Sequence, residues 1–110
     1  MSAMKTVDKP WGREIWFAVH HQYAGKILEV EKGHRLSHQY HKVKHETIYV
    51  LDGLVKVTHE GTDKVLKPGE AIEIKPGEKH RITAIEKSKL VEASTAHLDD
   101  VIRLEDDYGR

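Results

Sequence analysis

The segment HQYHKVKHE, residues 38–46, contains three histidines, a glutamine and a glutamate. If it forms a strand followed by a turn, alternate side chains point the same way, so Gln39 and His41 share one face. A turn at residues 42–44 would bring Glu46 back beside His41. Imidazole nitrogens together with carboxylate and amide oxygens are suitable ligands for divalent ions of intermediate hardness. The segment therefore indicates part of a metal site.

A second imidazole comes from His80, which follows the Pro76–Gly77 corner at the start of another expected strand. The chain has no cysteine, so disulfides and thiolate ligands are excluded and any metal must be held by nitrogen and oxygen. The competing interpretation is that these histidines lie on a polar strand that faces water. The ligand set would leave room for substrate oxygens on the ion.

The elements that must position these side chains are short strands. Turn residues recur along the chain, and most stretches between them alternate apolar and polar residues as half-buried strands do. We expect turns at Asp52–Gly53 and at the two Lys-Pro-Gly-Glu repeats, and no helix of ordinary length. The expected strands are residues 14–19, 26–31, 35–41, 47–51, 54–60, 64–67, 71–75, 80–86, 89–94 and 100–105. This pattern predicts an all-β sandwich or barrel.

The size and charge of the chain restrict its class. A length of 110 residues fits a single domain, residues 1–110, and the 38% of apolar residues form a lean core that a second copy would help to complete. We therefore expect a homodimer. Eighteen basic residues balance eighteen acidic ones, which argues against nucleic-acid and membrane partners. No signal-like or membrane-spanning apolar run occurs, so we expect a cytoplasmic protein.

The spacing of these residues resembles the two motifs of the cupin superfamily. The first runs from Gly33 through Gln39, His41 and Glu46 to Gly53, and the second contains Gly69, Gly77 and His80, with Lys75 where proline is usual. The resemblance implies a jelly-roll barrel, also called a double-stranded β-helix. It also implies that a divalent ion is held by Gln39, His41, Glu46 and His80. Zinc is the first expectation, with manganese, iron, nickel or cobalt as alternatives.

Within this superfamily the chain resembles the type II mannose-6-phosphate isomerases, including the C-terminal domain of the two-domain isomerase and guanylyltransferase enzymes. The similar pieces are KPWG (9–12), GHRLSHQYH (33–41), PGEKHRI (76–82), LVEAST (90–95) and DDVIRLEDDYGR (99–110). The resemblance implies that mannose 6-phosphate is isomerised to fructose 6-phosphate through a cis-enediolate. It shows no counterpart of the guanylyltransferase domain, so we expect no nucleotidyl transfer.

The resemblance also suggests catalytic residues. Glu92 falls on a glutamate of the corresponding family stretch and is the expected base, and Lys44 stands where many members have arginine. The substrate phosphate needs cations, preferably guanidinium groups. Arg103 is the first choice for it, and Arg35 and Arg81 are weaker ones. We expect Trp11 and Trp16 to cap the barrel or to form a dimer contact.

Simpler interpretations compete with these assignments. Glu92 could be a surface strand residue, and Arg103 could pair with the acidic run at residues 105–107. Two other functions fit the same fold, because one barrel hosts many chemistries. One is an Fe²⁺-dependent dioxygenase, which needs an apolar substrate pocket. The other is a sugar-binding module without catalytic activity.

Overall fold

The computed structural model describes residues 4–109, and every regular element in this range is a β-strand. None of these residues belongs to a helix that could cross a membrane. The strands are β1 (Lys5–Lys9), β2 (Gly12–Val19), β3 (Ala24–Val30), β4 (His38–Tyr40), β5 (Glu46–His59), β6 (Thr62–Leu66), β7 (Ala71–Ile74), β8 (His80–Ser94) and β9 (Ile102–Glu105). The prediction of an all-β jelly roll is confirmed.

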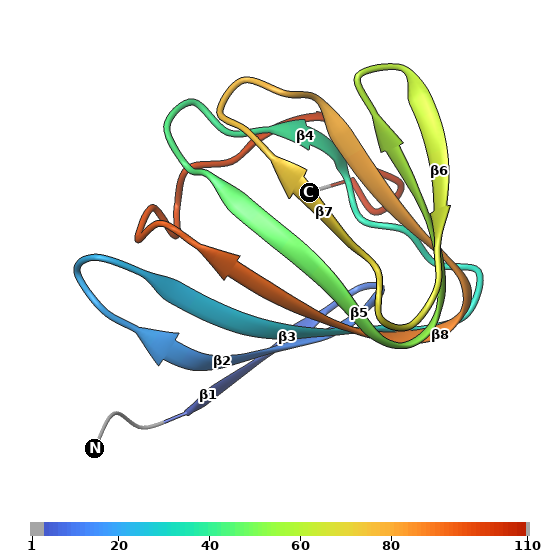
Figure 1. Cartoon of the computed structure of the whole chain (residues 1–110), viewed down its shortest axis with the longest axis horizontal. Coiled ribbons are helices and arrows are strands. Elements are labelled where there is room, and N and C mark those ends of the chain that lie inside the picture. The colour runs from blue at the N-terminus through green and yellow to red at the C-terminus, as the bar shows by residue number, and fades with distance from the viewer. Residues whose placement is uncertain (1–3, 110) are drawn as a thin grey trace.

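Two long strands, β5 and β8, pair antiparallel along almost their whole length and belong to both layers of the barrel. The first half of β5 and the second half of β8 lie in one layer with β1, β2, β3 and β7. Their other halves lie in the second layer with β4, β6 and β9. Figure 1 shows β1, β2 and β3 on one side of this ribbon and β4 on the other.

The β5–β8 ribbon must bend to fit the molecule. At one end Glu46 pairs with Ser94, and at the other His59 pairs with His80. A straight strand of the 14 residues of β5 would measure roughly 43 Å, whereas the longest dimension of the molecule is 36 Å. Three register shifts between Val50 and Val55 mark where the pairing is interrupted, and bulges of this kind bend strands. The bend folds the two layers over each other.

The prediction of a hairpin turn at Asp52–Gly53 is wrong, because Gly53 lies in this bulged region within β5. Its φ of 95° favours glycine, and a Cβ there would lie 2.3 Å from Ser88 Oγ and 2.4 Å from the Lys87 carbonyl oxygen. Glycine thus allows the two strands to stay close together. The expected strands at residues 80–86 and 89–94 likewise form one strand, β8, and β1 was not expected.

The core lies between the layers and takes its buried apolar side chains from β3, β5, β6, β7 and β8 and from the loops. In β3, Ala24, Leu28 and Val30 point inward and are buried, and so is Lys26, which shares their face by alternation. The other buried apolar side chains are Trp11, Leu36, Ile48, Val50, Val55, Val57, Leu66, Ile72, Ile74, Ile82, Ala84 and Leu90. A charged residue on the inward face of β3 therefore points to a functional interior.

Candidate metal centre

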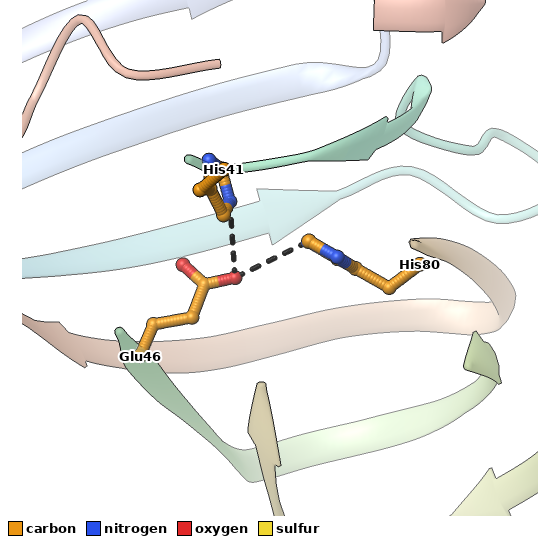
Figure 2. Close-up of side chains that lie close together, drawn as sticks. All are labelled: His41, Glu46 and His80. Carbon is orange, nitrogen blue, oxygen red and sulfur yellow. Dashed lines mark ion pairs between the residues drawn. The ribbon is translucent and has the colours of Figure 1, made fainter. Parts of the chain in front are cut away.

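His41, Glu46 and His80 converge inside the barrel (Figure 2). His41 follows β4, Glu46 opens β5 and His80 opens β8, and all three are buried. The Nε2 atoms of His41 and His80 lie 3.5 Å and 3.3 Å from Oε1 of Glu46. One potential ligand atom from each residue lies within 4.8 Å of the others. The structure therefore brings together three of the four residues expected to hold a metal.

The backbone sets which ring nitrogens can bind an ion. Nδ1 of His41 faces the carbonyl oxygen of Asp100 at 2.5 Å, and Nδ1 of His80 faces that of Glu78 at 3.0 Å. A carbonyl oxygen only accepts hydrogen bonds, so each Nδ1 donates and each Nε2 of a neutral ring carries a lone pair. Both lone pairs point toward a carboxylate oxygen. A metal cation between these atoms would satisfy the carboxylate and both nitrogen lone pairs.

Glu46 provides the negative charge at the centre of the cluster. Burial would raise the pKa of Glu46, but hydrogen bonds from His41 and His80 and the charge of Lys44 outweigh burial and hold this pKa well below its usual range. The pKa of His41 is raised, because contact with Glu46 outweighs the effect of burial. Oε2 of Glu46 is buried without a hydrogen bond of good geometry among residues 4–109, although Lys44 Nζ is 3.2 Å away. The donor set thus fits a divalent cation.

Gln39 lies beside the three converging residues. It pairs with His80 across β4 and β8, and its side-chain amide nitrogen donates to Ser37 Oγ at 3.0 Å. With Glu46 and His80 it bounds a void of about 20 Å³, which is the scale of one water molecule. Gln39 therefore stands where its amide oxygen can complete the expected ligand set, and its role as a ligand stays a prediction.

A buried ion pair adjoins the cluster. Lys44 Nζ lies 3.0 Å from Oε2 of Glu92, and both side chains are buried. Burial and the neighbouring Glu46 carboxylate raise the pKa of Glu92 to about 7 against the opposing charges of Lys44 and Lys26. The pKa of Lys44 is raised, because the two carboxylates outweigh the burial that would lower it. Lys44 and Glu92, both expected in the catalytic set, thus lie together next to the candidate metal ligands.

Asp100 holds the loop that carries Lys44. Its carboxylate accepts hydrogen bonds from the backbone nitrogens of Lys42, Val43 and Lys44 at 2.7 to 3.0 Å. These bonds lower the pKa of Asp100 to about 2. Since the carbonyl oxygen of Asp100 also accepts from His41, one residue positions both a candidate ligand and the buried lysine.

A cavity of about 410 Å³ opens beside the site, and Gln39, His41, Lys44 and Glu92 contribute to its wall. The rest of the wall is rich in charge. Its other lining residues are Lys5, Val7, Lys9, Trp11, Glu14, Trp16, Lys26, Leu28, Leu36, Leu98, Asp99, Asp100, Val101 and Arg103. A cavity of this size holds a small polar molecule.

The three arginines considered for phosphate binding differ in position. Arg103 lines the cavity, where it pairs with Gln39 across β4 and β9. Arg35 and Arg81 instead both bind the carboxylate of Asp107, at 2.5 to 3.1 Å, and neither lines the cavity. Of the three arginines, Arg103 is the one that lines the cavity, and its role in phosphate binding stays a prediction.

The sequence analysis did not predict the cavity residues that come from β2 and β3. Lys26 is 7% exposed and faces the cavity from β3. The sequence pattern could have predicted that Lys26 points inward, because Lys26 shares the face of Leu28 and Val30 in an alternating strand. Trp16 also lines the cavity, and Trp11 lies in the core and reaches the same cavity. Trp11 is too buried for the dimer contact that we considered, and the expected role of the two tryptophans as a barrel cap stays a prediction.

A family model described as "Cupin domain" matches residues 26–93 of this chain. The mannose-1-phosphate guanylyltransferase ManC of Salmonella typhimurium strain LT2 is 32% identical over 111 residues. That match covers 96% of this chain but only 23% of ManC, so the chain spans about a quarter of that relative.

Among solved structures, KdgF from Halomonas sp. has a TM-score of 0.80 at 20% identity, covering 84% of this chain and 86% of KdgF. The Streptomyces protein Pac13, described as a nucleoside dehydratase, has a TM-score of 0.81 at 13% identity, covering 94% of this chain and 86% of Pac13. At these identities the two structures establish the shared fold.

Proposed function

The chain belongs to the cupin domain family, and from that premise we propose that it is a metal-dependent sugar-phosphate isomerase. The proposed reaction converts mannose 6-phosphate to fructose 6-phosphate. The observation that carries the proposal is the convergence of His41, Glu46 and His80 beside the Lys44–Glu92 pair, on the wall of a charged cavity of about 410 Å³. The likeness to ManC, an enzyme named for a mannose phosphate, supports this choice of substrate.

In this proposal Glu92 is the base. Its carboxylate lies on the cavity wall, one side chain away from the candidate ligands, so it can reach a substrate without binding the ion. Isomerisation needs one proton to move from carbon 2 to carbon 1 and a second to move from the hydroxyl oxygen on carbon 2 to the oxygen on carbon 1. A single carboxylate can remove the proton from carbon 2 and return it to carbon 1, and the proton between the two oxygens can pass through solvent. A bound divalent ion would supply stabilisation of the negative charge that develops on the two sugar oxygens of the cis-enediolate.

Lys44 and Arg103 have different roles. Lys44 stays charged between Glu46 and Glu92 and holds both carboxylates in place. Arg103 is exposed at the cavity and has no ion-pair partner among residues 4–109, so its guanidinium is available to the substrate oxygens that lie near Gln39.

The test is a coupled assay that follows fructose 6-phosphate formed from mannose 6-phosphate. It uses protein loaded in turn with zinc, manganese, cobalt and nickel, and it includes glucose 6-phosphate and other hexose phosphates as substrates. Turnover that disappears on chelation and returns with metal is the expected result. Lack of turnover with every metal and sugar phosphate would overturn the proposal and favour a sugar-binding module.

An Fe²⁺-dependent dioxygenase fits the cavity less well. Such an enzyme needs an apolar substrate pocket, whereas this cavity is lined by the lysines, arginine and carboxylates named above. Iron in the purified protein together with oxygen consumption would favour the dioxygenase.

We also propose that the protein acts as a homodimer. Apolar side chains continue across the outer face of the first layer, because Ile15 pairs with Ile27, Ile27 with Val91, and Val91 with Tyr49. Tyr49 is 41% exposed. A second copy that covers this face would bury them, and sedimentation velocity would then give twice the mass of the chain.

A further inference from the structure

A row of inward side chains crosses four neighbouring strands and leads away from Glu92. Glu92 on β8 pairs with Lys26 on β3, Lys26 pairs with Trp16 on β2, and Trp16 pairs with Lys5 on β1. All four side chains line the same cavity. The row therefore connects the proposed base with two lysines near the edge of the sheet.

Trp16 and Glu14 hold the two lysines in place. The ammonium nitrogens of Lys26 and Lys5 lie 4.5 Å and 4.9 Å from the centroid of the Trp16 ring, where the face of an indole attracts cations. Glu14 accepts a hydrogen bond from Trp16 Nε1 at 2.9 Å and lies 3.5 Å from Lys26 Nζ.

The charges of Lys26 and Lys5 at this end of the row are compensated to different degrees. Glu14 is the one carboxylate that contacts Lys26 there, and Lys5 has no carboxylate partner among residues 4–109. Lys26, which is almost completely buried, faces Glu14 and, across β3 and β8, the charge of Glu92, whereas no carboxylate among residues 4–109 forms an ion pair with Lys5. Two ammonium groups this close together favour the binding of a further negatively charged group.

The spacing suits a hexose phosphate. Neighbouring strands lie about 4.8 Å apart, so Lys26 is one strand, Trp16 two strands and Lys5 three strands from Glu92. The carbon chain of a hexose, with bonds of about 1.5 Å, spans roughly 6 Å. A substrate with carbons 1 and 2 at Glu92 therefore extends its phosphate toward Trp16, where the ammonium groups of Lys26 and Lys5 lie 4.5 Å and 4.9 Å from the ring centroid.

Arg103 is placed differently. It pairs with Gln39 on the opposite wall, one strand from an expected metal ligand. Arg103 thus extends from a strand next to an expected ligand, whereas the ammonium groups of Lys26 and Lys5 both lie against Trp16, two strands from Glu92. The position of Lys26 and Lys5 agrees better with an anionic group several carbons from the reaction.

We propose that Lys26 and Lys5 form the subsite for the phosphate of the substrate, with Trp16 and Glu14 orienting the two ammonium groups. The ligand class is a phosphomonoester at the end of a short polyol chain. The identity of the sugar rests on the proposed function, whereas the anion subsite rests on the cavity itself.

Binding of mannitol 6-phosphate to metal-free protein tests the subsite, because this open-chain compound cannot be isomerised. Isothermal titration calorimetry compares wild type with Lys26→Met and Lys5→Met, and Lys64→Met on β6, outside the cavity lining, is the matched control. We expect at least tenfold weaker binding for Lys26→Met, several-fold weaker binding for Lys5→Met and wild-type binding for Lys64→Met. Lys26→Arg keeps the charge and should restore most of the affinity.

Several results would overturn the subsite. Unchanged affinity in both Lys26→Met and Lys5→Met is one, loss of affinity only in Arg103→Met is another, and lack of binding by wild type is a third. Lys5 is exposed, so its variant tests the proposal even if Lys26→Met fails to fold. Lysine-dependent binding without turnover would refute the isomerase and keep the subsite. Turnover with an unchanged KM in Lys5→Met and Lys26→Met would instead support the isomerase and refute the subsite.

Discussion

Lys44 Nζ lies 3.0 Å from Oε2 of Glu92, and the same ammonium lies 3.2 Å from Oε2 of Glu46. All three side chains are buried, so one cation compensates two carboxylates inside the barrel. Removing one partner of a buried ion pair is costly, because the remaining charge is left without compensation.

Lys44→Met should therefore destabilise the metal-free protein by about 3–5 kcal/mol, as is usual when a buried pair loses one member. Urea denaturation followed by circular dichroism measures the change. Lys42→Met, an exposed lysine two residues away, is the control and should change stability by less than about 0.5 kcal/mol. Equal stability of the two variants would show that Lys44 does not compensate the buried carboxylates.

His80→Ala should weaken metal binding by more than about 100-fold, since changes to residues that merely support metal ligands already cost 10–100-fold. The variant should still unfold cooperatively, because the apolar core lies between the layers and does not include the ligands. Metal content after dialysis measures the effect. His59→Ala is the matched control, because His59 pairs with His80 on the neighbouring strand but lies outside the three converging residues. Full metal content in His80→Ala would remove this histidine from the ligand set.

Glu92→Gln should lower turnover by about 10²–10⁴-fold, the usual contribution of a general base. Metal content should be unchanged, because Glu92 is not among the three converging residues. Glu86→Gln, an exposed glutamate on the same strand, is the control for surface charge. Turnover retained in Glu92→Gln would assign the proton transfer to another group.

Asp100→Asn should reduce stability at neutral pH but not in strong acid. Because the folded protein lowers the pKa of Asp100 from 3.8 to about 2, its carboxylate contributes fully above pH 3.8. That contribution is lost as the pH falls through about 2. The stability difference between wild type and Asp100→Asn should therefore be constant above pH 4 and shrink toward pH 2. A difference that grows in acid would contradict the hydrogen bonds from residues 42–44.

The strand–turn–strand pattern at residues 38–46 was sufficient to predict that Glu46 returns beside His41, because alternation and a short turn are local properties. The bend of β5 was not predictable in this way. Gly53 resembles a turn residue in sequence, and only its close approach to Ser88, 35 positions away in the chain, shows that the strand continues.

The cavity wall shows a different limit of sequence reasoning. Lys26 could have been recognised by its place among Leu28 and Val30, whereas β1 has only Val7 as an apolar residue and forms through its pairing with β2. Lys5 therefore reaches Trp16 through a contact between strands that local patterns do not encode. Metal binding, the catalytic roles and the phosphate subsite stay predictions for the experiments above.

The bend of the β5–β8 ribbon has one more consequence. Glu46 and His80 stand at opposite ends of this ladder, yet their side chains are 3.3 Å apart. The curvature of the ribbon thus sets how closely the two donor groups approach, and the register shifts between Val50 and Val55 mark where the ribbon bends. Substitutions in residues 50–55 would therefore change the distance between Glu46 and His80 without altering either side chain.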